Sequence, residues 1–532
     1  MKNKQNFIVV ILIILLICGL VFYSLPNSKA SENLAMVTMF EPDEGAMVPV
    51  IKRMVAPYPD LVHTIYRFIA YSFYHYGFPQ FAPSAITYKV LTWFGQGENM
   101  PLVMLSLRLL ITVLPMLVSL LVLVYLQDQF KSWRSIVLFV FLASVPAIIQ
   151  NGFWWHPDGL VMLFSSLVLY FLWKDNRNFS KYFYIAAVLC GVLVALKVVG
   201  FFFFLTIAVV MIWGLAEKKL TWKLFFQKAF IFIGIMILAI ILASPHLLIP
   251  SHRAFAFNTL KREIFETSKG YGIFYSKGLK ASWPTVNAFY GEAIFLLVTL
   301  GVSIWSLWEK ETRFLRVLIL SWFLPLSTYL LIFSHLKFQY WLPAALPLFS
   351  NLAFLIPKRG QKEGKPEKLV AVKLILVALV IVQFGLFLAK DAGLYTDRIN
   401  RKENSTAIKF YDLAVKELAP VTEQLKVYYD YRLYMPETKG WNVESSFDLL
   451  TYDYILSSNF NVLFLSQQRI FDYIQPDAVG IDPQTFPLAQ KFYGDANQEN
   501  IKGYKLLMRD EDTLLFIQEA LCLKYYGAER CQ

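Results

Sequence analysis

The sequence predicts a polytopic α-helical membrane protein with about 11 transmembrane helices and a C-terminal extracytoplasmic α/β domain. Of its 532 residues, 57% are apolar and only 17% are charged, whereas soluble domains average about 45–50% apolar and about 25% charged residues. Apolar runs of about 20 residues, long enough to cross a bilayer, recur through residues 1–390. Residues 391–532 are more polar. We therefore expect a membrane domain over 1–390 and a separate α/β domain over 391–532.

Eleven runs have the composition of a span. The run from Tyr182 to Leu215 is too long for one crossing, and Lys197 divides it into two spans. Ser28-Lys29-Ala30-Ser31 loosely resembles a signal-peptide cleavage site, but the long first run favours a retained span. The spans are expected at about 8–25, 102–126, 135–151, 158–173, 182–196, 201–215, 229–248, 288–307, 315–334, 340–356 and 369–389.

Charge in the connecting loops fixes the expected orientation. With the N-terminus inside, the cytoplasmic segments are 1–7, 127–134, 174–181, 217–228, 309–316 and 357–368. They contain 19 Lys and Arg against 7 Asp and Glu, and each one has a positive balance. This pattern satisfies the positive-inside rule. It also explains the net charge of +12 by topology rather than by nucleic-acid binding, because 391–532 carries −6 and 1–390 carries +18.

The external segments are then a large first loop at 26–100, the loops 152–157, 197–200, 249–287 and 335–339, and the whole tail. Leu61–Phe68 has the pattern of an amphipathic helix on the membrane surface. In the tail, strand-like runs at 426–429, 462–465 and 514–517 alternate with helical stretches such as Ser405–Leu418. Cys522 and Cys531 lie in this external tail, where a disulfide between them is plausible.

An acidic sequence, Glu41-Pro42-Asp43-Glu44-Gly45, follows the first span. Two adjacent carboxylates repel each other, so the pair needs a cation, a polar ligand or water beside it. A hydrated acidic loop is the simpler interpretation when the motif is taken alone. The external placement of the other candidate groups favours a catalytic carboxylate. The residues themselves do not choose between Asp43 and Glu44.

Two further external positions carry candidate groups. Trp154-Trp155-His156-Pro157-Asp158-Gly159 fits an ordinary turn with Asp158 as helix N-cap, but Trp155, His156 and Asp158 could also bind substrate, with the indole as a platform for a sugar ring. Lys197 interrupts a long apolar run. A lysine at membrane depth is a functional candidate by default, although a long side chain can also reach the surface from a span boundary.

The short loop before the tenth span contains His335, Lys337 and Tyr340. Its two basic side chains could meet a lipid phosphate there, or they could extend to the membrane surface without a ligand. Five features follow one another along the chain in a recognisable order: the first span, the acidic loop, the second Pro-Asp motif, the mid-chain lysine and this basic-aromatic loop. Tyr340 and Pro343 continue into a Tyr-x-x-Pro-x-x-x-Pro pattern that ends at Pro347.

This order resembles the C-type (GT-C) membrane glycosyltransferases, in particular the protein O-mannosyltransferase and aminoarabinose-transferase (ArnT-like) group. The resemblance covers about residues 1–390 and implies a GT-C-like fold. It assigns the catalytic carboxylate to Asp43, beside Glu44, and a second acidic residue to Asp158. It places Lys197, His335, Lys337 and Tyr340 near the phosphate of the donor. The Pro-rich stretch of the first loop departs from the family, since it appears only as Phe78-Pro79-Gln80-Phe81-Ala82-Pro83.

The expected function is an inverting transfer of a hexosyl or pentosyl group from a polyprenyl-phosphate donor at the outer face of the cytoplasmic membrane. A phosphate leaving group requires cations rather than a general acid, and one base suffices to deprotonate the acceptor, which could be a lipid, a glycan or a protein. A divalent metal ion held by Asp43 and Asp158 is a further possibility. The alternative is a transporter or flippase of a lipid-linked or anionic substrate, although the sequence contains no internal repeat of the kind common in transporters.

Overall fold

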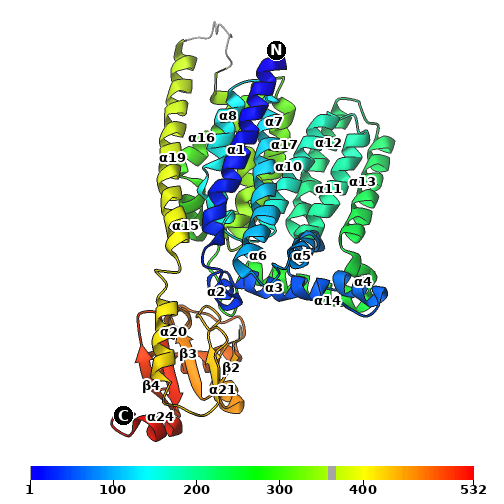
Figure 1. Ribbon diagram of the computed structural model, residues 1–532. Helices are drawn as coiled ribbons and strands as arrows, with labels where there is room; N and C mark the ends of the chain where they lie inside the picture. Colours follow the sequence, from blue (N-terminus) through cyan, green and yellow to red (C-terminus); the bar gives the residue numbers. More distant parts are fainter. Residues whose placement is uncertain (1, 358–366, 447–448, 532) are drawn as a thin grey trace.

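A tall bundle of helices carries a small sheet domain at one end (Figure 1). This computed structural model describes residues 2–357, 367–446 and 449–531. Most of the expected cytoplasmic loop 357–368 lies outside these residues. The N-terminus lies at the end of the bundle far from the sheet, and the C-terminus lies in the sheet domain. We call the end of the bundle that carries the sheet the domain side.

The bundle is formed by helices from both halves of the chain. The first half supplies α1 (Lys2–Ser28), α2 (Leu34–Phe40), α3 (Pro42–Val55), α4 (Leu61–Ile69), α5 (Phe78–Trp93), α6 (Met100–Leu107), η1 (Arg108–Val113), α7 (Leu114–Asp128), α8 (Arg134–Ala143), α9 (Pro146–Asn151), α10 (Asp158–Asp175), α11 (Lys181–Leu196) and η2 (Val198–Phe202). The second half supplies α12 (Phe203–Ala216), α13 (Trp222–Ala243), η3 (Pro245–Leu248), α14 (Pro250–Lys269), α15 (Leu279–Tyr290), α16 (Ala293–Trp305), η4 (Ser306–Trp308), α17 (Arg313–Thr328), η5 (Tyr329–Phe333), η6 (Phe338–Trp341), α18 (Leu342–Ser350), η7 (Asn351–Leu355) and α19 (Glu367–Asn400).

Six helices in the described ranges are long and apolar enough to cross a membrane, or seven if the bent pair α15 and α16 counts as one span. The six cover Lys4–Ser28, Met100–Asp128, Val198–Ala216, Trp222–Ala243, Arg313–Phe333 and Val370–Asn400. Helices α8 and α11 are apolar but shorter. All eleven expected runs contain helix, but this length criterion does not confirm eleven crossings. The chain is a multi-pass helical membrane protein.

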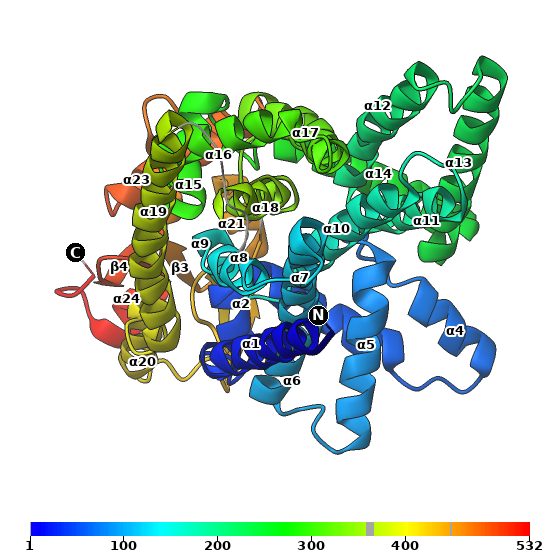
Figure 2. The same cartoon turned by 90° about the horizontal axis from the view of Figure 1, so that it is seen from above.

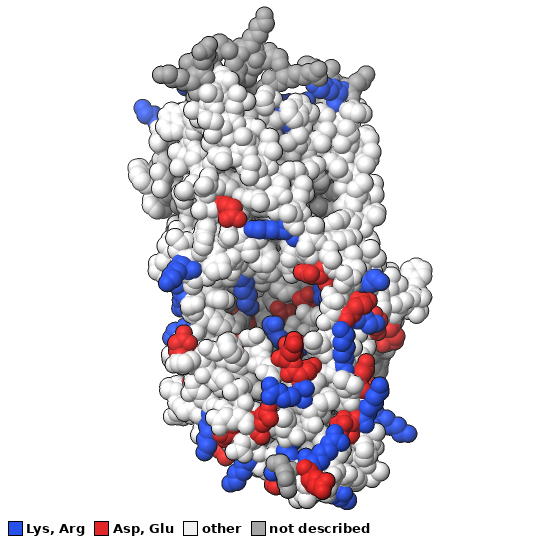
Figure 3. Space-filling model, turned by 90° about the vertical axis from the view of Figure 1, so that its left-hand side faces the viewer, with Lys and Arg blue, Asp and Glu red and all other residues white. Residues whose placement is uncertain are grey.

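The arrangement of the bundle places several helix ends on the domain side. Seen from above, α11, α12 and α13 form one flank, α15, α16 and α19 form another, and α7, α10 and α18 lie between them (Figure 2). On the face that Figure 3 shows, only a few charged side chains lie over the bundle, whereas many gather over the sheet domain and the adjoining loops. Helices α3, α4 and α14 lie across the domain side (Figure 1). The expected amphipathic helix is α4, which exposes Leu61 (72%) and Val62 (75%).

The tail contains a five-stranded sheet of order β2-β1-β3-β5-β4. Strand β1 pairs in parallel with β2 and β3, while β5 pairs antiparallel with β3 and β4. The three strand-like runs expected from the sequence lie in β1, β3 and β5. The elements are α20 (Thr406–Glu417), β1 (Leu425–Tyr429), β2 (Trp441–Glu444), α21 (Tyr452–Ser458), β3 (Val462–Ser466), α22 (Gln467–Ile474), α23 (Thr485–Asn497), β4 (Tyr504–Arg509), β5 (Thr513–Gln518) and α24 (Glu519–Tyr526).

Alternation along the central strands gives the sheet two apolar faces. In β3, Leu463 and Leu465 pack in one buried cluster with residues of α21, α22 and α23. Val462 and Phe464 pack in the other cluster with residues of α20 and α24. This two-sided burial explains why β3 reads as a continuous apolar run rather than an alternating one. The tail is a three-layer α/β domain.

Backbone hydrogen bonds fasten this domain to the bundle. The segment between α14 and α15 runs beside the loop after α22, where the amide of Phe274 donates to Val479 O (2.8 Å) and the amide of Ile481 donates to Gly272 O (2.9 Å). Lys402 also pairs with Glu32 at 2.8 Å. Helix α19 continues past the expected boundary at residue 390 as far as Asn400. The sheet domain is therefore held against the domain side from two directions.

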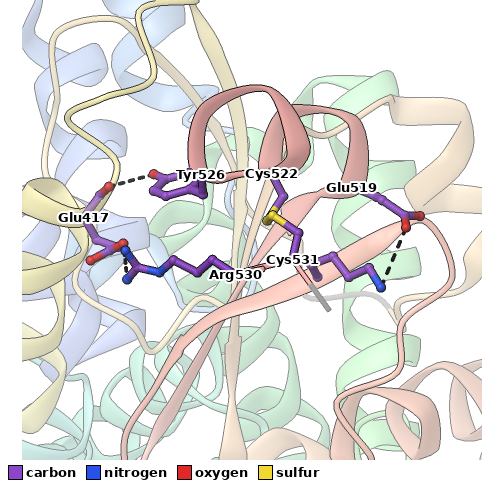
Figure 4. Close-up of a disulfide and its surroundings, with 7 residues drawn as sticks. Glu417, Glu519, Cys522, Tyr526, Arg530 and Cys531 are labelled. Atoms are coloured by element: carbon purple, nitrogen blue, oxygen red, sulfur yellow. Dashed lines mark hydrogen bonds and ion pairs between the residues drawn. A yellow bond between two sulfur atoms is a disulfide. The ribbon is translucent and has the colours of Figure 1, made fainter. Parts of the chain in front are cut away.

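Cys522 and Cys531 form a disulfide with Cα atoms 5.9 Å apart (Figure 4). It joins α24 to the end of the described chain. Next to it, the Tyr526 hydroxyl donates to Glu417 O (2.7 Å), and Arg530 pairs with the Glu417 carboxylate (2.6 Å). The C-terminal segment is thus fixed to the end of α20.

A buried ion pair positions the acidic loop. The Arg108 guanidinium binds both oxygens of Glu44, with Nε 2.9 Å from Oε1, and both side chains are fully buried. Arg108 also donates to Asn27 O at 2.9 Å. Since Glu44 belongs to α3, Arg108 to η1 and Asn27 to α1, this one group joins the loop to two membrane helices.

Replacement of Glu44 by alanine (Glu44→Ala) leaves Arg108 buried without its counter-ion. We expect the free energy of unfolding in mixed micelles to fall by about 3–5 kcal/mol. The matched control Glu98→Ala removes an ion pair between Lys52 and the exposed Glu98. The free energy of unfolding should then change by less than about 1 kcal/mol. Equal effects of the two substitutions on chemical denaturation would contradict the anchoring role of Glu44.

Replacement of Cys522 by serine (Cys522→Ser) opens the loop of sequence separation 9 that the disulfide closes. The loss of loop closure should destabilise the sheet domain by about 2–3 kcal/mol. Protease susceptibility of the tail across a denaturant series measures this change. The free cysteine Cys18 supplies the control Cys18→Ser, which should leave the series unchanged.

Candidate active site

A cavity of about 1660 Å³ lies where the bundle meets the sheet domain. Its wall combines the start of α3, the loop before α5, the turn before α10, η2, α14, the loop before η6 and the edge of the sheet domain. Most of the polar residues proposed from the sequence line it: Asp43, Asp158, Lys197, His335, Lys337 and Tyr340. The tertiary structure thus brings together residues from four separate parts of the chain.

The two adjacent carboxylates of the acidic loop have different surroundings. Helix α3 begins at Pro42, so Asp43 and Glu44 occupy its first turn, where the helix dipole favours negative charge. Successive helical residues point about 100° apart. Asp43 therefore lines the cavity, while Glu44 points into the bundle and is fully buried against Arg108. Only Asp43 is placed to meet a ligand in the cavity.

Ion pairs with two arginines also fix the residue that precedes α3. Glu41, which precedes α3, accepts from Arg398 (2.8 Å) and from Arg401 (3.1 Å) at the end of α19. Arg398 also donates to Phe153 O. The start of α3 is thus linked to the last helix of the bundle and to the segment before α10.

Tyr76 is a site residue that the sequence alone did not identify. Its hydroxyl donates to Asp43 Oδ2 at 3.0 Å. The next residue, Gly77, packs against the end of α11 so closely that an added Cβ would lie 1.9 Å from Ala195 O. Only glycine permits this approach, which brings the Tyr76 loop to the region of Lys197. The one sign of this role in the sequence is Gly77, which directly follows Tyr74-His75-Tyr76.

The Trp-Trp-His-Pro-Asp sequence divides between the core and the cavity. Trp154 lines the cavity and stacks on His156, with ring centroids 4.3 Å apart. Trp155 is fully buried instead, and its indole donates to Ser84 Oγ at 3.0 Å. Trp154, rather than the expected Trp155, is the indole available to a substrate.

Asp158 is not the N-cap expected for an ordinary turn, because it is the first residue of α10 and Pro157 precedes it without a side-chain cap. Its carboxylate has two other partners. Lys197 Nζ lies 2.8 Å from Oδ1, and His156 Nδ1 contacts Oδ2. The side chains of Asp158 and His156 are only 1% and 2% exposed, so the carboxylate charge of Asp158 acts in a weakly screened environment.

Two lysines face one aromatic ring. Lys197 Nζ lies 4.2 Å from the centre of the Tyr340 ring, and Lys337 Nζ lies 5.9 Å from it. Lys197 is the extended residue at the break between α11 and η2, as the sequence predicted. Burial lowers the pKa of Lys337 from its usual value. A nearby anion would restore the preference for the charged ammonium.

His335 lies at the rim of this group, with Nδ1 3.5 Å from Ser276 O. Burial lowers the pKa of His335, so this side chain is a weaker source of positive charge than the two lysines. The sheet domain adds Tyr431, Arg432 and Tyr473 to the cavity wall. Nothing in the local sequence of the tail marks these residues, because the docking of the domain places them there.

In the described residues, the cavity carboxylates take part in a network of hydrogen bonds and ion pairs rather than in a grouped set of metal ligands. In the described part of the chain, no three His, Cys, Asp or Glu side chains come together as a metal-binding group. Asp43 and Asp158, the expected ligands, are separated by Tyr76 and His156. Both oxygens of Asp158 already have cationic or hydrogen-bonding partners. The donor set fits an ion-pair network instead.

No family model and no curated protein matches the sequence. Solved structures do match the fold. A structure of ArnT from Cupriavidus metallidurans bound to undecaprenyl phosphate has a TM-score of 0.54 at 11% identity, over 96% of this chain and 97% of that one. The apo structure of the same protein has a TM-score of 0.50 at 12% identity, with the same coverage. The chain therefore shares the overall fold of ArnT over nearly its whole length, which confirms the resemblance to this group at the level of fold.

Proposed function

We propose that the protein is a membrane glycosyltransferase that moves a sugar from a polyprenyl-phosphate donor to an acceptor hydroxyl or amine. The observation that carries this proposal is the arrangement of the cavity. A carboxylate, Asp43, and a pair of lysines, Lys197 and Lys337, line the same space. A base and a phosphate-binding cation pair are the two groups that this reaction requires. ArnT, whose fold the chain shares, is solved with undecaprenyl phosphate.

The donor phosphate would bind beside Tyr340, between the two lysines. Both ammonium groups lie within 6 Å of its ring centre, and Lys337 is less well solvated than an exposed lysine. An apolar wall continues from this position along Val198, Val199, Phe201, Phe202 and Leu330. This wall suits the prenyl chain of a lipid donor.

The charged side chains of the cavity then each have a role in the proposed transfer step. As the bond between the anomeric carbon and the phosphate oxygen breaks, its electron pair leaves with the phosphate, where the lysines stabilise the added charge. Asp43 accepts the proton of the attacking acceptor group. Direct attack opposite the leaving phosphate inverts the anomeric configuration.

The acceptor would enter from the sheet-domain side. Tyr431, Arg432 and Tyr473 form that part of the cavity wall, and tyrosine rings with flanking charges suit a lipid headgroup, glycan or peptide. We place this side at the outer face of the cytoplasmic membrane, because the opposite end of the bundle carries loops with a positive balance, such as 174–181 and 217–228. There the donor would be lipid-linked rather than a nucleotide sugar.

Replacement of Asp43 by asparagine (Asp43→Asn) removes the proposed base and keeps the shape of the side chain. We expect kcat to fall roughly 100-fold or more in an assay of the purified protein with a panel of polyprenyl-phosphate sugars, with products identified by mass spectrometry. The exposed carboxylate Glu98 provides the control Glu98→Gln, which should keep wild-type transfer. Undiminished transfer by Asp43→Asn would refute the assignment of the base. A wild-type protein that moves the lipid-linked sugar across vesicles without transferring it would support the transporter alternative.

Replacement of Lys337 by glutamine (Lys337→Gln) removes one of the two cations without breaking the Asp158–Lys197 pair. The loss of one charged contact to the donor phosphate should raise the donor KM about tenfold or more and leave the acceptor KM within about twofold. Lys52, an exposed lysine paired with Glu98 outside the cavity, gives the control Lys52→Gln. An unchanged donor KM in Lys337→Gln would show that the phosphate binds elsewhere.

A further inference from the structure

A chain of hydrogen bonds and ion-pair contacts links the proposed base to the proposed phosphate-binding cation. Asp43 Oδ2 accepts from the Tyr76 hydroxyl at 3.0 Å, and His156 Nε2 lies 3.0 Å from the same hydroxyl oxygen. On its other side, His156 Nδ1 pairs with Asp158, whose second oxygen binds Lys197 Nζ at 2.8 Å. The five side chains come from the first external loop, the turn before α10 and the break after α11.

The Tyr76 hydroxyl has one hydrogen and two partners, so the chain has two protonation states. With Nδ1–H donated to Asp158, a neutral His156 has an unprotonated Nε2 that accepts from Tyr76. If Tyr76 donates to Asp43 instead, Nε2 must carry a hydrogen and donate to the Tyr76 oxygen, which makes His156 an imidazolium. The two states differ by one proton, and that proton resides on His156.

We propose that the acceptor proton does not stay on Asp43 but passes through Tyr76 to His156, and that Asp158 stabilises the imidazolium so formed. In this step the acceptor oxygen forms its bond to the anomeric carbon and gives its proton to Asp43. Asp43 gives a proton to the Tyr76 oxygen while the Tyr76 hydroxyl proton moves to His156 Nε2. Asp43 is again a carboxylate, and the phosphate leaves with the electron pair of the broken bond. This inference rests on the proposed function.

The surroundings of the chain suit a relay of this kind. Burial and, to a smaller extent, the negative charge of Asp43 raise the pKa of Tyr76 well above its usual value. The phenol therefore keeps its proton at rest, and it passes a proton on rather than acting as a base. The charged and titratable groups around Tyr76 and His156 are Asp43 on α3, Asp158 on α10, Lys197 after α11 and Tyr340 on η6. Trp154 covers one face of the His156 ring.

The relay also couples the two halves of the reaction. Asp158 is shared by His156 and Lys197, so its charge is divided between an imidazole and an ammonium. When His156 gains a proton, Asp158 binds it more strongly and its attraction for Lys197 weakens. Lys197 can then turn toward the phosphate as negative charge develops there. In this scheme Tyr76 transfers the proton and His156 stores it, and neither function is required if Asp43 and Lys197 act alone.

The test is Tyr76→Phe, which keeps the ring beside His156 (ring centroids 4.8 Å apart) and removes the hydroxyl that would transfer the proton. We expect kcat to fall roughly 10- to 100-fold with the donor KM within about twofold of wild type. The rate of the wild-type enzyme against the mole fraction of D2O should curve, because several protons move together, and the plot for Tyr76→Phe should be linear. The plot for His156→Gln should be linear as well, because the proton can no longer reach the imidazole.

Tyr88 supplies the matched control, since its hydroxyl bonds the exposed Glu98 at 3.4 Å. Tyr88→Phe should keep the wild-type kcat and the curved dependence of rate on D2O. If the wild-type enzyme transfers sugar and Tyr76→Phe keeps both of these properties, the relay is overturned while the proposed function stands. A wild-type protein without transfer from any polyprenyl-phosphate sugar would overturn both. If Tyr76→Phe fails to fold, His156→Gln alone decides through its kcat and its dependence of rate on D2O.

Discussion

The buried pair of Glu44 and Arg108 connects the first external loop to the helix bundle. Neither side chain is exposed, so each charge depends on the other for the solvation that burial removes. The same carboxylate accepts the backbone N–H of Trp155, and Arg108 reaches the end of α1 through Asn27 O. The short π-helical segment η1, which begins at Arg108, widens the helix at this point. One pair of charges therefore sets the position of α1, α3 and the turn before α10, and with them the positions of Asp43 and His156.

The site uses neighbouring residues for opposite purposes. Asp43 and Glu44 differ by one position on a helix, which turns one carboxylate to the cavity and the other to the core. Trp154 and Trp155 divide in the same way, one stacked on His156 and the other buried beside Ser84. In both cases the buried member fixes the backbone, so the cavity member is positioned without having to make strong contacts of its own. This arrangement leaves Asp43 available to a substrate.

Charge at the site is balanced through shared partners. Asp158 stands between His156 and Lys197, and Tyr340 stands between Lys197 and Lys337. The two lysines and the carboxylate Asp43 are thus connected through side chains that also hold the fold together. The sheet domain completes the enclosure, since its loop after α22 pairs with the segment before α15.

The sequence by itself determined the membrane character, the positions of the helical runs, the break at Lys197, the α/β tail and a set of candidates: the pair Asp43 and Glu44, with Asp158, Lys197 and Lys337. Hydropathy, loop charge and the scarcity of charged groups in apolar runs are local properties, and they can be read without knowing the fold. The tertiary structure decided which neighbour of each pair faces the cavity, that Glu44 and Trp155 belong to the core, that α19 extends to Asn400 and that Tyr76 joins Asp43 to His156. These features depend on the direction of a side chain on a packed helix and on contacts between residues from 33 to 80 positions apart, which no local pattern encodes.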